Sequence, residues 1–306
     1  MPYVTSDMTT AMRTNVKALF MKGLTEMADQ NNNWQKIATV IPSDSDKEEY
    51  NWLGATPPME EWIDERKLRG LRPYSYTLTN QDWESTLEIN RNAFEDNKLG
   101  HIPMRVKGLV RSYFRRVALD VFSKLDGGAA DLATFDAGYF FKTDRTIADS
   151  GTINNLITGD YSESEDQVRA GLAAAVVLMM GYKDDWGNAL GLMPDTVVCS
   201  PSMYILIKQA IHVPGVAGTT RAEAEFVKNI VVSPWIDGAV TTWYLLCTTE
   251  EVKPIIFQER KKPEVTSLDK PDDRDVFMRK TLFYGIDARF TVGYGDPRTA
   301  VQIVNS

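Results

Sequence analysis

Side chains suited to catalysis are few in this chain and are scattered along it. The two histidines, His101 and His212, stand in unrelated contexts, and neither belongs to a zinc-binding spacing such as H-x-x-x-H or H-E-x-x-H. The two cysteines, Cys199 and Cys247, each lie in an apolar segment, which predicts two buried reduced thiols and not a disulfide. We therefore predict that none of these four residues is catalytic, and that each histidine lies at the surface or in a turn.

Two aspartate pairs and one glycine pair are the remaining candidates for a ligand site. Asp184-Asp185 and Asp272-Asp273 could bind a hard cation, but adjacent acids in hydrophilic loops are usually solvated, and no spaced oxygen-ligand loop accompanies them. Leu125-Asp126-Gly127-Gly128 resembles a phosphate loop, yet it follows a predicted helix instead of opening one, so we interpret it as a helix stop. Walker A, dinucleotide-binding and nucleophile-elbow motifs do not occur. We predict no cofactor, no metal and no enzymatic activity.

The sharpest charge pattern is a run of acids followed at once by a run of bases. It consists of Glu60, Glu61, Asp64 and Glu65, then Arg66, Lys67, Arg69 and Arg72. Such a run is usually a solvated face. Alternatively, it belongs to an extended arm whose acidic and basic ends meet complementary ends on neighbouring subunits, which would fix their register more than it adds affinity. These eight residues are our candidates for an intersubunit interface.

Composition limits the classes of protein that remain. The chain has 306 residues, 43% of them hydrophobic, enough to bury a core in one large domain or two smaller ones. Its net charge of −8 argues against a protein that binds the outside of a nucleic acid, but suits a container that must not hold DNA tightly. Residues 1–10 lack the features of a signal peptide, and no apolar run is long enough to span a bilayer. We expect a soluble protein made in a cytoplasm, with no membrane partner.

Hydrophobic periodicity predicts two amphipathic helices in the first half of the chain. Residues 9–27 have apolar side chains at helical spacing. Residues 104–125 form the clearest element, a helix about 33 Å long that ends before Gly127-Gly128. Arginines opposite its apolar stripe suggest either a solvated or ion-paired face or a nucleic-acid contact, and we favour the first. They are Arg105, Arg111, Arg115 and Arg116.

The remaining elements form a mixed block of helices and strands without an internal repeat. Alternation predicts strands with one polar side at 74–79 and 86–90, and residues 165–181 predict a helix that is apolar almost all round and therefore buried. Residues 196–199 predict a short strand that leads into a helix capped by Ser200-Pro201. Further strands are predicted at 229–232, 241–247, 254–258 and in 276–304, with turns at Gly285 and at Gly295-Asp296-Pro297.

A set of short motifs occurs in a fixed order along nearly the whole chain. They are Tyr50-Asn51-Trp52-Leu53-Gly54, Trp62 with Glu65-Arg66, Phe94-Glu95-Asp96, Phe140-Phe141 with Asp144, Gly151-Thr152 with Asn154-Asn155-Leu156, Leu192 with Pro194, Ser200-Pro201, Trp243-Tyr244-Leu245-Leu246, Arg260 with Pro263, Tyr284-Gly285 with Arg289, and Val292-Gly293-Tyr294-Gly295. As an ordered set they resemble the Mu-like phage major head subunit (gpT) family. Arg145, where we expect a histidine, and Asn97, where an aspartate is common, depart from the pattern.

The resemblance implies an α+β fold of the kind shared by tailed-phage capsids, herpesvirus capsid floors and encapsulins, the Hong Kong ninety-seven type. It divides the chain into an N-terminal arm (1–58), an extended loop (59–97), a peripheral domain with a spine helix (98–161), an axial domain (162–260) and return strands of the peripheral domain (261–306). These boundaries place the eight charged residues in the extended loop.

The function implied is that of a major capsid protein in the virion. Copies of the chain would self-assemble as pentamers and hexamers into an icosahedral shell and enclose double-stranded DNA without binding a specific sequence. Portal, scaffold and maturation protease would be separate partners, and a decoration protein could be another. Two alternatives stay open at this point: an encapsulin-type compartment shell, and a soluble α/β enzyme that uses His101 or His212.

Overall fold

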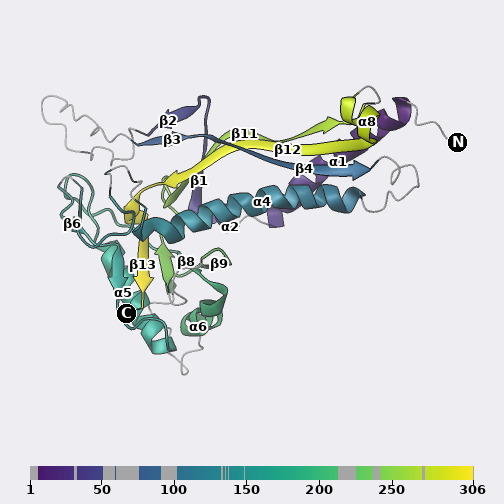
Figure 1. The fold of residues 1–306 in the computed structure, drawn as a ribbon. Helices are drawn as coiled ribbons and strands as arrows, with labels where there is room; N and C mark the ends of the chain where they lie inside the picture. Colours follow the sequence, from purple (N-terminus) through teal and green to yellow (C-terminus); the bar gives the residue numbers. More distant parts are fainter. Residues whose placement is uncertain are drawn as a thin grey trace, which may run out of the picture.

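The structure, a computed structural model, describes residues 6–30, 33–50, 59, 76–90, 102–131, 134, 136, 138–147, 149–212, 225–236, 242–270 and 273–305. It has two parts, a long limb built on extended strands and long helices, and a compact lobe at the C-terminal end of helix α4 (Figure 1). The long limb comprises α1, α4 and the four-stranded sheet β1-β11-β12-β4. The compact lobe comprises the five-stranded sheet β7-β13-β10-β8-β9 with helices α5 and α6.

The sheet of the long limb is built on a long antiparallel hairpin. Strands β11 (Ile255–Leu268) and β12 (Thr281–Tyr294) pair along their length, β4 (Gln81–Asn90) pairs antiparallel with β12, and β1 (Ala38–Pro42) pairs parallel with β11. Exposed and covered residues alternate along β4 and the second half of β11. This period of two is expected for strands with one face on a core and one face toward solvent.

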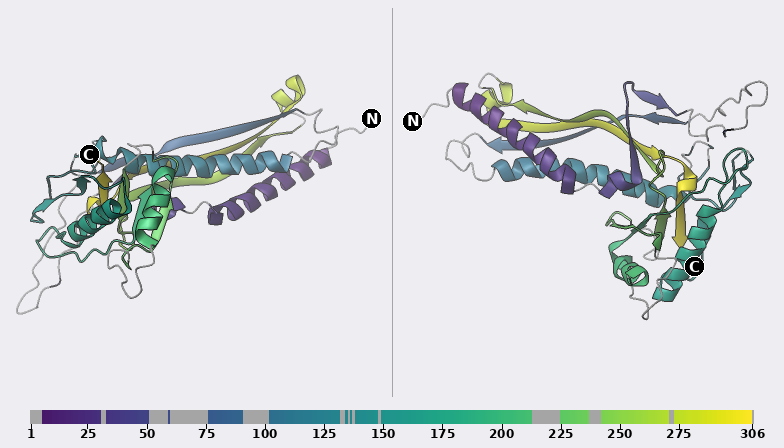
Figure 2. Two further views of the ribbon diagram at one scale, coloured as in Figure 1. Left: turned by 90° about the horizontal axis from the view of Figure 1, so that it is seen from below. Right: turned by 180° about the vertical axis from the view of Figure 1, so that it is seen from behind.

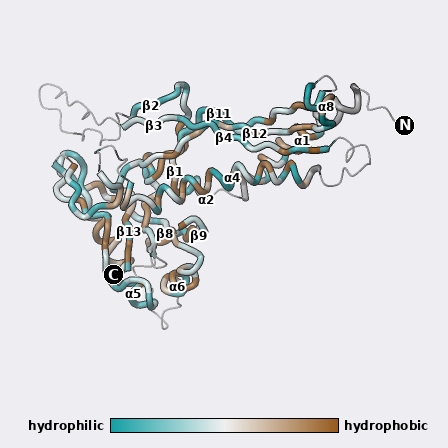
Figure 3. The backbone as a smooth tube through the Cα atoms, viewed as in Figure 1, coloured by the Kyte–Doolittle hydropathy of each residue, from teal (hydrophilic) through white to brown (hydrophobic). Residues whose placement is uncertain are grey.

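Two long helices cover one face of this sheet. Helix α4 (Ile102–Asp126) lies along the strands, and α1 (Ser6–Gln30) packs beside it, as the two views of Figure 2 show. Apolar residues recur every three or four positions on α4, and these residues are buried against the sheet. The hydropathy colouring of Figure 3 shows hydrophobic and hydrophilic residues following one another along the helix. Both helices confirm the predictions from periodicity, and Val110 and Val117 are fully buried, as expected of a core stripe.

The sheet of the compact lobe is buried on both faces. Its central strands β8 (Thr196–Cys199) and β10 (Trp243–Leu246) are buried at every position. Alternate residues of β10 pack against α5 (Glu165–Met180) and α6 (Pro201–His212) on one face and against the C-terminal half of α4 on the other. The lobe sheet is thus the middle layer of three, which explains why its strands are apolar at successive positions.

One outer strand on each side completes the lobe sheet. Strand β9 (Asn229–Val232) runs parallel to β8 and follows α6, and β7 (Leu156–Thr158) runs parallel to β13 (Ala300–Val304). The predicted strands at 196–199 and 229–232 and the helix that begins at Pro201 are confirmed. Cys199 and Cys247 are free and buried, which confirms the prediction of two reduced thiols.

Three details of the C-terminal half differ from the sequence-based expectations. Gly285 does not form a turn but lies inside β12, with no positive φ; the hairpin instead reverses through α8 (Arg274–Arg279), which ends at the left-handed Lys280. An extended backbone accommodates glycine, so glycine alone does not predict a turn. Helix α5 is not buried all round, because Val177 is 72% exposed. Finally, β12 joins the limb sheet whereas β13 joins the lobe sheet, so the return strands separate.

Candidate assembly site

The predicted interface residues Glu60, Glu61, Asp64, Glu65, Arg66, Lys67, Arg69 and Arg72 lie outside the described residues. The structure does describe the two chain segments between which they are inserted. These are β2 (Lys47–Glu49) and β3 (Thr77–Thr79), a short antiparallel pair next to the limb sheet (Figure 1). We call this pair and its immediate contacts the loop base.

Buried polar contacts join the loop base to the long hairpin. The Tyr50 hydroxyl donates a hydrogen bond to Oε1 of Gln258 at 2.7 Å, and Nε2 of Gln258 donates to Oδ1 of Asn80 at 2.8 Å. The backbone N–H of Tyr294 donates to the Tyr76 hydroxyl at 2.9 Å. Gln258 is completely buried, so its amide needs both partners. The two ends of the inserted segment are therefore held by the same hairpin strands.

A tight turn before β2 fixes the first of these ends. The Glu48 carboxylate accepts hydrogen bonds from the Ser43 hydroxyl at 2.9 Å and from the backbone N–H groups of Asp44 and Ser45. These donors, the Ser43 hydroxyl foremost, hold the pKa of Glu48 below its ordinary value. The turn is closed on the other side by Asn80, whose amide donates to the Ser43 hydroxyl at 3.0 Å.

Close packing fixes the second end. A side chain at Gly293 would come within 2.6 Å of atoms of Leu78 and Tyr76, so only glycine lets β12 approach the loop base this closely. Burial raises the pKa of Tyr76 to about 12, which keeps its hydroxyl neutral and able to accept the bond from Tyr294. The loop base thus fixes the described residues on either side of the inserted segment, Tyr50 before it and Tyr76 after it.

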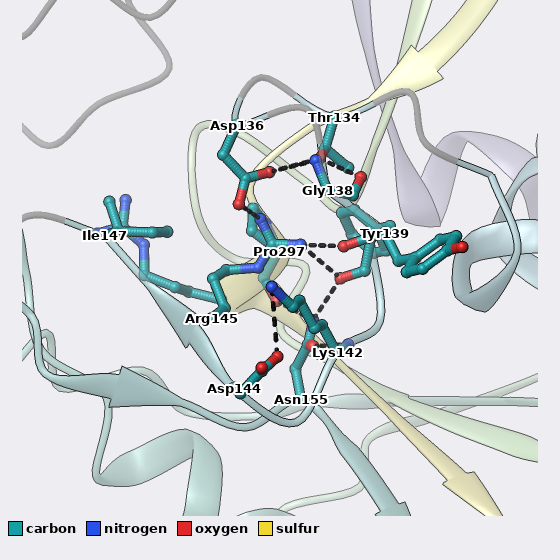
Figure 4. A network of polar contacts seen from close by, with 12 residues as sticks. Thr134, Asp136, Gly138, Tyr139, Lys142, Asp144, Arg145, Ile147, Asn155 and Pro297 are labelled. Carbon is teal, nitrogen blue, oxygen red and sulfur yellow. Dashed lines mark hydrogen bonds and ion pairs between the residues drawn. The ribbon is translucent and has the colours of Figure 1, made fainter.

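A buried arginine organises the turns at the junction of limb and lobe. Arg145, on the short strand β5 (Arg145–Thr146), has a fully buried side chain that pairs with Asp136 at 2.6 Å (Figure 4). It also donates to the backbone carbonyls of Tyr139 and Phe140. Burial by itself would raise the pKa of Asp136, but the Thr134 hydroxyl and the Arg145 guanidinium together hold it below its ordinary value.

The same turns are joined to the C-terminal strand by an amide side chain. Asn155 is completely buried and donates to the carbonyls of Phe140, at 2.9 Å, and Pro297, at 3.0 Å (Figure 4). Its own Oδ1 accepts from the backbone N–H of Lys142 at 2.8 Å. This single residue therefore connects the chain around 140 to the start of β13. Arg145, which stands where the family pattern predicts a histidine, therefore lies at the centre of a local structural network.

A second buried arginine lies beside the first network. Arg298 pairs with Asp185 at 2.9 Å and with Asp296 at 2.7 Å, and the side chains of Arg298 and Asp185 are 3% and 1% exposed. Burial alone would lower the pKa of Arg298, but the two carboxylates raise it above its ordinary value. Asp185 is therefore not simply solvated, as its hydrophilic neighbours suggested. It is part of a structural ion pair rather than a cation site.

A family model for the Mu-like prophage major head subunit gpT matches residues 9–167 and 219–305. The chain belongs to this family. It is 27% identical over 295 residues to a Mu-like prophage FluMu major head subunit of Haemophilus influenzae, and 25% identical over 293 residues to the major capsid protein of Escherichia phage Mu. Each alignment covers 96% of this chain and 72% of the relative. The protein is thus a head subunit, a structural component of the phage virion.

Solved structures show the same fold. A procapsid chain of bacteriophage JBD30 is 26% identical, with a TM-score of 0.55 over 95% of this chain and 74% of that one. A capsid chain of Cyanophage P-SCSP1u is 13% identical, with a TM-score of 0.56 over 89% of this chain and 88% of that one. The α+β fold with two long helices and two sheets is therefore the tailed-phage capsid fold predicted from the motifs.

The described part of the head subunit offers little for chemistry. Burial raises the pKa of the Cys199 thiol to about 12, so it is a poor nucleophile. No cluster of three or more His, Cys, Asp or Glu residues among the described side chains is arranged to hold a metal ion. His101 lies outside the described residues, and His212 ends α6 with a side chain that is not described. None of the helices described has the length and apolar character needed to cross a membrane.

Sequence analysis named Tyr50, Asn155 and Tyr294 as motif residues, but it assigned no structural role to the residues that organise the loop base and the junction. Gln258 had a visible signal, because it is the polar end of the apolar run Ile255-Ile256-Phe257. Arg145 and Asp185 had none, since an arginine or an aspartate in a hydrophilic segment is usually solvated. The predicted helix stop at Gly127-Gly128 is confirmed: α4 ends at Asp126, and a side chain at Gly128 would come within 2.7 Å of the Phe141 ring.

Proposed function

We propose that the head subunit closes into pentamers and hexamers that build an icosahedral shell around double-stranded DNA, and that it acts without catalysis. The observation that carries the proposal is the loop base, in which Tyr50 and Tyr76, the described residues that flank the charge-segregated segment, are both hydrogen-bonded to the long hairpin. Many weak, geometrically matched contacts between identical copies make a closed shell more stable than any single contact.

We assign the segment from Glu60 to Arg72 to contacts between subunits. In this proposal the acids Glu60, Glu61, Asp64 and Glu65 meet basic groups of a neighbour, and the bases Arg66, Lys67, Arg69 and Arg72 meet acidic ones. An exposed ion pair contributes only about 0 to 1 kcal/mol, but repetition around every capsomer multiplies this small contribution. The charges therefore select the register of neighbours more than they determine the stability of one subunit.

The domain division is part of the proposal. Residues 1–58 form the N-terminal arm, 59–97 the extended loop, 98–161 the peripheral domain with its spine helix, and 162–260 the axial domain. The position of α4 in the limb and of α5, α6, β8 and β10 in the lobe supports placing the spine helix and the axial domain in different parts of the subunit, although β11 crosses the boundary at 260 and β7 joins the lobe sheet. Residues 261–306 return through the limb as β12 and then enter the lobe sheet as β13. Separate chains would provide the portal, the scaffold, the maturation protease and a decoration protein.

Charge reversal tests the proposed interface. The triple variant Arg66→Glu, Lys67→Glu and Arg69→Glu should melt at nearly the wild-type temperature but give few particles in a light-scattering assay, and high salt should weaken wild-type assembly in the same direction. The matched control Lys228→Glu, Lys262→Glu and Lys270→Glu makes the same charge change at exposed positions elsewhere. Normal particles from the first variant would assign its charges to solvation, and a collapsed melting temperature would place them in the subunit's own fold.

Particle morphology and content separate the proposal from its alternatives. Electron microscopy and gel filtration of the purified wild type should show capsomers or closed shells, whereas an enzyme should elute as a small oligomer. Particles produced during infection should contain nuclease-protected double-stranded DNA, and a protein cargo in its place would favour an encapsulin-type compartment. A turnover abolished by alanine at His101, His212, Cys199 or Cys247 would contradict the absence of catalysis.

A further inference from the structure

Helix α4 has an exposed basic face on the side opposite its buried stripe. Arg105, Arg111 and Arg115 are exposed there, together with Gly108. At 100° per residue, positions 108 and 115 point almost directly away from buried Val110 and Val117, and 105 and 111 lie on either side of them. We call Arg105, Arg111 and Arg115 the arginine face.

Within the part of the chain that the structure describes, the arginine face lacks an ion pair of the kind that the neighbouring Arg116 makes. Within the described residues, none of its three side chains makes an ion pair or a hydrogen bond. By contrast, Arg116, one position along, pairs with Asp120 at 2.7 Å and stacks over the Trp83 ring. Among the described residues, this side of α4 is therefore not ion-paired, and we take its cations as available to an anion from outside the subunit.

The other side of the limb has the opposite charge. Register places Glu84 of β4 opposite Asp287 of β12 and Asp287 opposite Glu264 of β11, and Asp82 and Glu88 lie on the same face of β4 as Glu84. Lys261 and Arg289 are each held by carboxylates, Lys261 by Asp287 and Glu264, and Arg289 by Asp46 and Asp82. Arg260 of β11 is also exposed, so the described acids outnumber the bases on this side of the sheet, whereas the outer side of α4 carries the arginines.

In a shell whose limbs lie flat in the wall, one of these two faces is directed toward the contents. We propose that the arginine face of α4 is the inward one and that it binds the phosphates of the enclosed double-stranded DNA. The inference rests on the proposed function, because it needs a shell with DNA inside. The sign of the charge decides the direction: a polyanion is attracted to the arginine face and repelled by the acidic sheet face.

The dimensions of the arginine face suit a DNA backbone. From Arg105 to Arg115 the helix rises about 15 Å at about 1.5 Å per residue, along which one strand of B-DNA presents about four phosphates at about 3.4 Å each. A side chain added at Gly108 would meet nothing within 4 Å, so the middle of the face is open to a close approach of the phosphate backbone. Contacts of this kind carry no sequence information, which suits a shell that must accept any genome sequence.

The test measures DNA binding separately from assembly. A fluorescently labelled short DNA duplex of mixed sequence is titrated with the unassembled full-length subunit at several salt concentrations, using anisotropy. For Arg105→Gln, Arg111→Gln and Arg115→Gln combined, we expect the affinity at low salt to fall about tenfold or more. The slope of log affinity against log salt should decrease by about 2 to 3, since each lost phosphate contact removes about 0.9.

A matched control removes equal charge elsewhere. Lys228→Gln, Lys262→Gln and Lys270→Gln combined should leave affinity and salt slope close to the wild type, and both triple variants should melt at the wild-type temperature because all six residues are exposed. No binding by the wild type, no loss in the α4 variant, or an equal loss in the control would overturn the inference. Loss of binding to polyglutamate with DNA binding retained would also overturn it, in favour of an acidic protein partner.

Electron microscopy of the same preparations separates a failure of the proposed function from a failure of the arginine-face inference. If the wild type forms no particles, the proposed function fails, whatever the anisotropy shows. If the wild type forms shells and the α4 variant binds DNA as tightly as the wild type does, only the arginine face is wrong. We expect the α4 variant to form shells of normal size, because the face is directed at the contents and not at a neighbouring subunit.

Discussion

The long limb and the compact lobe bury their sheets in different ways. In the lobe, β8 and β10 are buried at every position because helices cover the sheet on both faces. In the limb, β4 and the second half of β11 alternate between exposed and covered residues, since only α1 and α4 cover them. A sheet covered on one face can extend as far as its helices do and leave its other face free. The limb is therefore suited to reach neighbours, and the lobe to act as a stable block.

The largest expected effect is at the place where the two parts meet. Val117 is fully buried among residues of α4 and both sheets, so Val117→Asp would bury an unpaired charge. We expect a cost above about 4 kcal/mol, a large part of the total stability of a typical domain, and therefore no soluble folded subunit. Expression of the variant, followed by circular dichroism of its soluble fraction, measures whether any folded subunit is present.

The control for that variant is a valine on the lobe surface. Val177 of α5 is 72% exposed, and Val177→Asp should change the free energy of unfolding by less than about 0.5 kcal/mol. A folded Val117→Asp subunit that merely fails to assemble would show that the α4 stripe is an interface between subunits. The limb and the lobe would then not share a hydrophobic core at α4.

The second effect tests the ion pair that closes the lobe. Asp185→Asn should cost about 3 kcal/mol, because the buried Arg298 guanidinium loses one of its two carboxylates. Urea unfolding should show a lower midpoint at an unchanged m-value. The adjacent Asp184→Asn keeps an oxygen that can accept from the backbone N–H groups of Trp186 and Asn188, so it should have a much smaller effect. Equal losses of stability in the two variants would contradict the prediction that the buried Asp185 contributes more than Asp184.

The third effect tests whether the loop base is held by the limb. Tyr50→Phe removes the hydroxyl that donates to Gln258 and leaves a buried amide oxygen without that partner, at a cost of about 1 to 3 kcal/mol. Amide hydrogen exchange should accelerate in β2 and β3 more than in β8 and β10. Tyr139→Phe, at a tyrosine that is 39% exposed, is the matched control and should change neither the free energy of unfolding nor the exchange rates in β2 and β3. Uniform acceleration across both sheets would contradict a local role.

The smallest effect is a dependence on pH at the junction. The folded-state pKa of Asp136 is lowered, so its contribution to stability is present above the unfolded pKa of about 4 and is lost as pH falls through the folded value. The wild type should therefore lose stability between about pH 5 and about pH 3, and Asp136→Asn should be less stable at neutral pH with a flatter acid limb. Asp144→Asn, at an exposed acid on the same segment, should retain the wild-type slope.

Local patterns were sufficient to predict the longest helices and several core strands. The apolar stripe at 104–125, the strand at 196–199 and the helix that begins at Pro201 all appear where periodicity and capping placed them. Gly285 shows the limit of such signals, because glycine is compatible with an extended strand as well as with a turn. The exposed Val177 shows another limit: an apolar helix in one subunit is not necessarily buried within that subunit.

Partners distant in sequence could not be predicted. Arg298 meets Asp185, 113 positions away, and Tyr50 meets Gln258, 208 positions away. Neither contact leaves a local signal, because a charged or amide side chain looks the same in sequence whether water or a buried partner satisfies it. The interface role of the segment from Glu60 to Arg72 stays a prediction, since those residues lie outside the described part of the chain.

The sequence by itself determined the longest helices, the core strands, the buried thiols and the family, because periodicity and ordered motifs depend on residue types at short spacing. Only the tertiary structure decided that β13 leaves the limb for the lobe, that Arg145 is buried with Asp136, and that Arg105, Arg111 and Arg115 face outward without an ion pair to any residue that the structure describes. Those outcomes depend on which distant segments come within a few ångströms of one another, and that is a property of the packed chain.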